Sequence, residues 1–181
     1  MSIKRPKLVI TWPTRNDLDA MVDIYNQAIR SGVATGHTKE FTRQRRWEWY
    51  KSHHNMTFPI YLMKYERKVI GYGTLSPYRE GRQAMRNIAE VSFFLDENYQ
   101  GKGFGRVLLQ KMINDTRRVK IKTLIAILLD VNKKSVRLLK KFGFQKWGHF
   151  PGVIEFEDKT CGQLIYGKKI TEDDYVDLIF T

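Results

Sequence analysis

The segment Gln100–Gly105 has the residue types of an anion-binding loop. Its three glycines, at 101, 103 and 105, permit tight turns and let a ligand approach the main chain closely. A helical pattern runs from Gly103 to about Arg117. Because a helix start presents unpaired N–H groups and the positive end of the helix dipole, the segment predicts a phosphate or pyrophosphate site. Lys102 and Arg106 add positive charge beside it.

The glycine spacing distinguishes this loop from two common nucleotide-binding loops. The Walker pattern, four spacer residues before Gly-Lys-Ser/Thr, does not occur in it. The dinucleotide pattern G-x-G-x-x-G is not met, because the glycines fall at every second residue and the loop lies mid-chain. From the loop alone, a structural turn that caps a helix is an alternative interpretation.

Apolar patterning predicts the elements that would position the loop. The unbroken run 124–129 indicates a strand buried on both faces. The helix before it indicates that it runs parallel to the strand 88–95. The predicted strands are 8–12, 59–65, 69–75, 88–95, 124–129, 145–150 and 162–168. Four helices are predicted. The first follows a capping box at Thr14 and Asp17, and the others cover 42–52, 103–117 and 132–142. Gly143 is suited to end the last of them.

The element order predicts a mixed α/β domain, and no linker divides the chain. We therefore expect one domain over residues 1–181, with a core of about 8–170. The tail, 171–181, is acidic and ends in an apolar run. It could dock on the basic body of the protein or be frayed.

Composition narrows the class of protein. With 42% hydrophobic and 28% charged residues, the chain reads as soluble and globular, and no apolar run is long enough to cross a membrane. The single cysteine, Cys161, excludes an intrachain disulfide, and with four scattered histidines it argues against a metal site. We expect a cytoplasmic location. The net charge of +13 could attract nucleic acid or a phosphorylated cofactor, or it could belong to a basic surface that binds no partner. The sequence contains no nucleic-acid-binding motif, so nucleic acid is the less favoured partner.

Two segments resemble the GNAT superfamily of N-acetyltransferases. Gln100, Gly103 and Gly105 are similar to the family signature Q/R-x-x-G-x-G/A, and 132–144 resembles its N-x-x-S-x-x-L-(Y)-x-x-x-G-F segment. A predicted buried strand separates the two, as in the family. The resemblance implies an α/β (mixed α+β) GNAT-type single domain, in which a central, mostly antiparallel twisted sheet has a splayed parallel strand pair and flanking helices. It also implies an enzyme that uses acetyl-CoA as co-substrate, with no metal.

The resemblance also implies how acetyl-CoA is held. The strand that ends in Phe93, Phe94 and Leu95 would pair its backbone with the pantetheine arm. The pyrophosphate would lie on the loop formed by Gln100, Gly101, Lys102, Gly103, Phe104 and Gly105. Asn132 would contact the cofactor, with Ser135 close by. Two alternatives come from the residues themselves: one of the two phenylalanines is expected in the core, and Asn132 is also a suitable helix N-cap.

A closer resemblance is to the phosphinothricin-acetyltransferase-like branch of the family. It rests on the segments 23–26 and 71–73 and on Gly143-Phe144 followed by Gly148. Glu90 falls where that branch carries a glutamate proposed as general base, which makes it the candidate catalytic residue. An ion pair with Arg82 or Arg86 is the alternative. The branch's Trp-x-Asp is replaced here by residues 161–163, Cys-Gly-Gln, so the resemblance does not extend to the substrate.

The general acid has no clear candidate. Many superfamily members carry a tyrosine where this chain has Leu139, which has no proton to donate. The thiolate could leave unprotonated or take a proton from water, because the pKa of a thiol is comparatively low. A tyrosine elsewhere, such as Tyr72 or Tyr166, is another alternative.

The acceptor is the least determined part of the reaction. Arg79, Arg82 and Arg86 could bind an acidic acceptor or form a solvated turn, and Trp47, Trp49 and Tyr50 could line a pocket or pack in the core. The leading hypothesis is acetylation of a primary amine on a small molecule, such as an amino acid or analogue. The alternatives are a protein or peptide N-acetyltransferase and a non-catalytic CoA-binding module. A homodimer is left open.

Overall fold

The computed structural model describes residues 8–53 and 56–178, and the predictions that fall on 1–7 and 179–181 lie outside them. The strands are β1 (Leu8–Thr11), β2 (Ile60–Tyr65), β3 (Lys68–Pro77), β4 (Ile88–Leu95), β5 (Thr123–Leu129), β6 (Gln145–Glu155) and β7 (Thr160–Lys169). The α-helices are α1 (Leu18–Ser31), α2 (Arg43–Ser52), α3 (Phe104–Asp115) and α4 (Lys133–Lys141). Short 3-10 turns cover Arg15–Asp17, Gln83–Met85, Glu97–Tyr99 and Glu172–Asp174.

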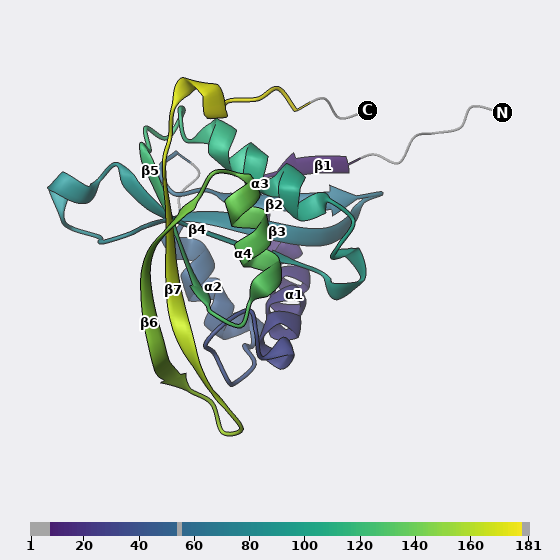
Figure 1. Ribbon diagram of the computed structural model, residues 1–181. Coiled ribbons are helices and arrows are strands. Elements are labelled where there is room, and N and C mark those ends of the chain that lie inside the picture. The colour runs from purple at the N-terminus through teal and green to yellow at the C-terminus, as the bar shows by residue number, and fades with distance from the viewer. Residues whose placement is uncertain (1–7, 54–55, 179–181) are drawn as a thin grey trace.

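The described strands form one sheet in the order β1-β2-β3-β4-β5-β7-β6. The neighbours pair antiparallel except β4 and β5, which are parallel and are connected through α3. Figure 1 shows α3 and α4 on one face of the sheet and α1 and α2 on the other. The predicted mixed sheet with one parallel pair is therefore confirmed.

Alternation along the strands builds a separate core on each face of the sheet. On the α3 side, Ala89 and Val91 of β4 pack with Leu108 and Met112 of α3. On the α1 side, Tyr72 of β3 packs with α1 residues such as Met21 and Ile24. Because β4 supplies side chains to both cores, it is fixed from both faces.

Local signals placed most helix ends correctly. The capping box at Thr14 and Asp17 is present and leads into α1 through a 3-10 turn. The residue after the C-cap of α4, Gly143, has a φ of 76°, the left-handed conformation that a glycine there predicts. Asn132 caps the start of the same helix.

The predicted end of β6 at residue 150 was wrong. The strand continues to Glu155, because a register shift between Phe150 and Ile154 absorbs Pro151 and Gly152 without ending the pairing with β7. β6 is an edge strand, where a proline removes no ladder hydrogen bond that the sheet needs.

The described part of the tail docks against the body. Asp174 lies 2.6 Å from the Nζ of Lys168, and its carbonyl accepts a hydrogen bond of 2.9 Å from Gln110 of α3. Arg117 pairs with Glu172 and lies over the ring of Tyr175. Of the two alternatives for the tail, docking holds for residues 171–176. No helix in the described ranges is long and apolar enough to cross a membrane.

Candidate active site

β4 and β5 pair only over their first three positions. The register joins Ile88 to Thr123 and ends where Glu90 meets Ile125, although β4 continues to Leu95. β3 stays paired with β4 to its end, so only the β5-facing edge of 91–95 lacks a strand partner. A free backbone edge can hydrogen-bond an extended ligand, as an added strand would. This is the splay that the family resemblance implied.

The side chains at the end of β4 are packing residues. Phe93 and Leu95 pack against the core on the α3 side. Phe94 points to the other core, where its ring centroid lies 4.9 Å from that of Tyr25 and 5.5 Å from that of Tyr72. Both phenylalanines therefore pack partly into the cores, one on each side of the sheet, and a cofactor contact by Phe93, Phe94 or Leu95 stays a prediction.

The loop after β4 needs its glycines for backbone conformation and for open space. Gly101 and Gly103 have φ values of 75° and 89°, and a Cβ added at either would meet no atom within 4 Å. Gly105 is different. A Cβ there would lie 3.4 Å from Leu95 and from Leu138, so it is the glycine that lets α3 pack closely.

The amides of residues 101–105 make no hydrogen bond with the described chain, whereas the flanking amides of Gln100 and Arg106 do. These unpaired donors lie at the positive end of α3, the arrangement that a pyrophosphate requires. Lys134 lies at 3.5 Å from the side-chain oxygen of Gln100 and brings a cation of α4 to the loop. Sequence reasoning missed Lys134, because α4 and the loop meet only in the folded chain.

Asn132 lies just after β5, and the loop 100–105 follows β4. Because these two strands are parallel, both lie at the C-terminal end of the pair. The side-chain oxygen of Asn132 accepts a hydrogen bond of 3.1 Å from the amide of Ser135. The N-cap interpretation is therefore correct for Asn132. A cofactor contact by Asn132 or Ser135 stays a prediction.

Glu90 occupies the last paired position before the splay and is half-buried. Burial raises the pKa of its carboxyl, and a hydrogen bond from Ser92 partly opposes this. Arg86 donates instead to the carbonyl of Gln83, and no ion pair to Glu90 occurs within the described residues. A carboxylate with a raised pKa and no counter-ion has the properties of a general base.

Two polar residues that the sequence analysis did not single out, Ser76 and His53, lie on the same face of the sheet as Glu90. Ser76 of β3 is the register partner of Glu90, and its hydroxyl lies 3.2 Å from Nε2 of His53, at the end of α2. The Nδ1 of His53 is 2.9 Å from the carbonyl of Trp49. Burial lowers the pKa of His53, and the charge of Arg46 adds to this. A neutral ring would donate from Nδ1 and accept from Ser76.

The structure places the three residues considered for the general acid in the two cores of the protein. Leu139, which has no proton to donate, is buried in the core on the α3 side. Tyr72 faces the same side as Glu90, and burial raises its pKa far above the usual range. Tyr166 belongs to the opposite core.

The residues suggested for the acceptor separate into two groups. Arg79, Arg82 and Arg86 lie exposed in the turn between β3 and β4, which favours the solvated alternative. Trp49 packs beside Tyr72, whereas Trp47 stacks on Tyr50. No group of three or more His, Cys, Asp or Glu residues suited to a metal occurs within 8–53 and 56–178.

Comparison with known proteins identifies the family. The model of the acetyltransferase (GNAT) family matches residues 18–144. The chain belongs to the acetyltransferase (GNAT) family. It is 36% identical to "Putative phosphinothricin acetyltransferase YwnH" of Bacillus subtilis, over 86% of this chain and 94% of that one. It is 27% identical to L-methionine sulfoximine/L-methionine sulfone acetyltransferase of Salmonella typhimurium, over 81% and 85%.

The fold of the chain also matches that of a solved acetyltransferase structure. The crystal structure of a "putative phosphinothricin N-acetyltransferase" superposes with a TM-score of 0.86 at 34% identity, over 92% of this chain and 100% of that one. The predicted superfamily, its phosphinothricin-acetyltransferase-like branch and the enzyme class are confirmed.

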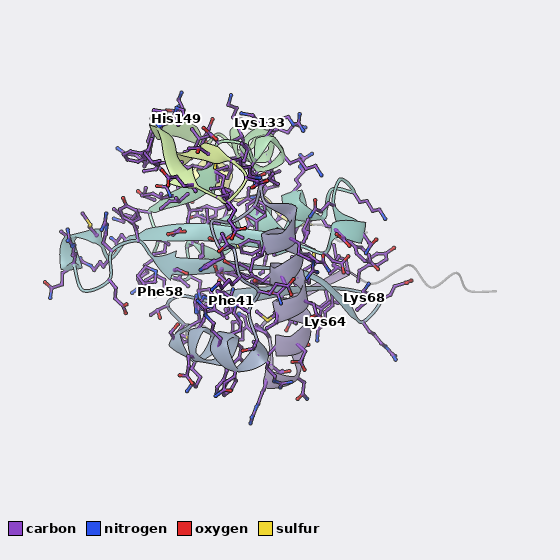
Figure 2. The ribbon with its side chains drawn as sticks, turned by 90° about the horizontal axis from the view of Figure 1, so that it is seen from below. Phe41, Phe58, Lys64, Lys68, Lys133 and His149 are labelled. Atoms are coloured by element: carbon purple, nitrogen blue, oxygen red, sulfur yellow. The ribbon has the colours of Figure 1, made fainter. Side chains whose placement is uncertain are left out.

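Gly162, the middle residue of the segment 161–163, is closely surrounded in this GNAT protein. A Cβ at Gly162 would lie 2.5 Å from Asp130 and 2.7 Å from His149. Those two side chains are 3.2 Å apart and connect the end of β5 to β6. Figure 2 shows His149 on the same side of the molecule as Lys133 at the start of α4. A larger residue at 162 would break this pair.

Proposed function

We propose that this protein transfers the acetyl group of acetyl-CoA to the primary amine of a small molecule, and that the acceptor is an amino acid or an amino acid analogue. The observation that carries the proposal is the free backbone edge of β4, with Glu90 at its start and five unpaired amides after its end. Membership of the GNAT family supports acetyl-CoA as the donor. The names of the relatives support an amino-acid-like acceptor.

Each part of the site has a task in this reaction. The amides of 101–105 would bind the pyrophosphate, and the edge of β4 would align the pantetheine arm. Glu90 would take a proton from the ammonium, which leaves a neutral amine to attack the acetyl carbonyl. A backbone N–H of residues 93–95 would stabilise the oxyanion that forms. Because Leu139 has no proton to donate, water would supply the proton for the leaving thiolate.

A thiol-release assay with acetyl-CoA tests the proposal. The acceptors are L-methionine sulfone, phosphinothricin, common amino acids, spermidine and short peptides. We expect turnover with one or more amino acids or analogues and none with peptides. Turnover with peptides alone would favour a peptide N-acetyltransferase. Acetyl-CoA binding without turnover of any acceptor would favour a non-catalytic CoA-binding module.

Three predictions from the sequence go beyond this assay. We propose that the protein is cytoplasmic, that it forms one domain, and that it can assemble as a homodimer. Gel filtration with light scattering would measure the assembly directly.

A further inference from the structure

Arg46 of α2 is buried, and no described residue gives it an anionic partner. It is 6% exposed, and it is the only lysine or arginine in the buried set of the described chain. Its guanidinium lies 3.4 Å from the ring centroid of Trp49 and 4.4 Å from that of Tyr25. No carboxylate within residues 8–53 and 56–178 forms an ion pair with it.

The hydrogen-bonding capacity of Arg46 is mostly unused. Nη2 donates to the hydroxyl of Tyr72 at 3.0 Å. Nε is buried and has no partner among the described residues. A guanidinium has five N–H donors and stays charged at any ordinary pH. Aromatic rings stabilise the charge but accept none of these N–H groups in the plane of the fork, so the fold leaves a desolvated cation that is incompletely satisfied.

The surroundings of Arg46 are held in place. Asn26 of α1 exchanges two hydrogen bonds with the backbone of Phe41, of 2.9 and 3.0 Å. This fixes the segment before α2, and Phe41, labelled in Figure 2, stacks on Tyr25. These bonds therefore fix Phe41 within the aromatic cage that Tyr25, Phe41, Trp49 and Tyr72 form around Arg46. The fork of a guanidinium held by such rings suits the planar, two-point recognition of a carboxylate.

Arg46 and Glu90 lie on the same face of the sheet. Tyr72, which Arg46 contacts, alternates along β3 with Thr74 and Ser76, and the last of these is opposite Glu90. Ser92 is opposite Thr74, between the two ends. Positions two apart on a strand are separated by about 7 Å. An amine held near Ser92 and an anion held near Tyr72 therefore fit one small molecule with a hydrogen bond at each end.

We propose that Arg46 binds the carboxylate of the acceptor, and that it selects molecules with an acidic group beside the amine, such as α-amino acids. This rests on the proposed acetyl transfer and assigns the acceptor end of that site. Arg46 is a specificity residue in this scheme, and Glu90 remains the base. The exposed arginines at 79, 82 and 86 are not needed for it.

The test compares L-methionine sulfone with 3-(methylsulfonyl)propylamine, the same molecule without its carboxylate. The wild-type enzyme should prefer the amino acid. Arg46→Met keeps an apolar chain between Trp49 and Tyr25, and it should lower kcat/KM for the amino acid on the order of 10- to 100-fold, mainly through KM. The kcat/KM for the amine should fall far less. Arg46→Lys, which keeps the charge and loses the fork, should fall in between.

Arg45→Met is the matched control, because Arg45 is exposed on the same helix with its guanidinium 4.2 Å from the Phe41 ring. Arg45→Met should leave kcat/KM unchanged for both acceptors. Circular dichroism and thermal melting would establish that each variant is folded. An equal loss for both acceptors in a folded Arg46→Met enzyme would show a structural role and overturn the inference.

A binding experiment separates this inference from the proposed reaction. Calorimetry would measure L-methionine sulfone and the amine against protein saturated with CoA, which cannot turn over. Tighter binding of the amino acid that is lost in Arg46→Met supports the carboxylate site, even if no acceptor is acetylated and the proposed reaction fails. Equal binding of both molecules to the wild type would refute the carboxylate site whatever the acetylation assay shows.

Discussion

The two halves of the candidate site are built differently. The cofactor half, the loop 100–105 with the free edge of β4, offers backbone amides in a conformation that glycines at 101 and 103 set. The proposed acceptor half consists of side chains from α2, β3 and β4, which meet only when the chain folds. A main-chain site can be conserved in form while its neighbours vary, whereas a side-chain site changes with each substitution.

This contrast explains how a GNAT protein can keep one donor and change acceptors. The donor half depends on strand pairing and a helix start, which many sequences satisfy. The acceptor half depends on single contacts such as Arg46 with Tyr72 and His53 with Ser76. The predictions below separate the two halves, since acetyl-CoA affinity reports on one and acceptor turnover on the other.

Glu90→Gln should have the largest effect. It removes the base and keeps the size of the side chain, so kcat should fall about 10²- to 10⁴-fold while the affinity for acetyl-CoA is retained. Thiol release and calorimetry measure the two quantities. Glu80→Gln, in the exposed turn before β4, is the control and should retain full activity. A Glu90→Gln enzyme with wild-type kcat would remove Glu90 from the mechanism.

Gly103→Ala should damage the cofactor half alone. A φ of 89° is costly for alanine, by about 1–2 kcal/mol, so the loop should shift and acetyl-CoA affinity should fall about tenfold. The KM of the acceptor should stay constant at saturating acetyl-CoA. Gly152→Ala is matched, because Gly152 also has a positive φ and open space beside it, but lies in β6. If both variants lose affinity equally, the loop has no special role.

The sequence alone was informative where local chemistry decides the structure. The tight turns at Gly101 and Gly103, the N-cap at Asn132 and Gly143 after α4 depend on residues close in the chain, and the sequence predicted each of these local conformations. The end of β6 was wrong for the opposite reason. Pro151 is a local stop signal, but pairing with β7 on the far side of a register shift overrides it.

The acceptor half could not be predicted, because its contacts join distant residues. Arg46 and Tyr72 are 26 positions apart, and His53 and Ser76 are 23 apart. α2 is highly charged, so nothing in its pattern marks Arg46 as the one that turns inward. The alternation of Tyr72, Thr74 and Ser76 along β3 is the signal that could have indicated a polar face beside Glu90.

Lys134→Ala should have a small effect on the donor half. Its ammonium is exposed and close to Gln100, so acetyl-CoA affinity should fall about two- to fivefold. The loss should shrink as salt is added, because exposed charges are screened. Lys140→Ala removes the same charge from the last turn of α4 and is the control. An effect that does not depend on salt would argue against an electrostatic contact.

Ser92→Ala should change the pH dependence of the acceptor half. The Ser92 hydroxyl donates to the Glu90 carboxylate and so lowers the pKa that burial raises. Its removal should raise the pKa of Glu90 further. Because the base acts only when deprotonated, the acid limb of the pH profile of kcat/KM should move to higher pH. At alkaline pH the kcat/KM values of the wild type and the variant should converge.

The same experiment tests whether Glu90 is the group that titrates. The acceptor amine ionises identically with either enzyme, so a difference between the two pH profiles belongs to the protein. Thr74→Ser, at the position opposite Ser92, keeps a hydroxyl on this face and should leave the limb in place. A shift to lower pH in Ser92→Ala would contradict the donor role of Ser92. An unchanged limb would place the titrating group elsewhere and leave His53, which faces Ser76, as the next candidate.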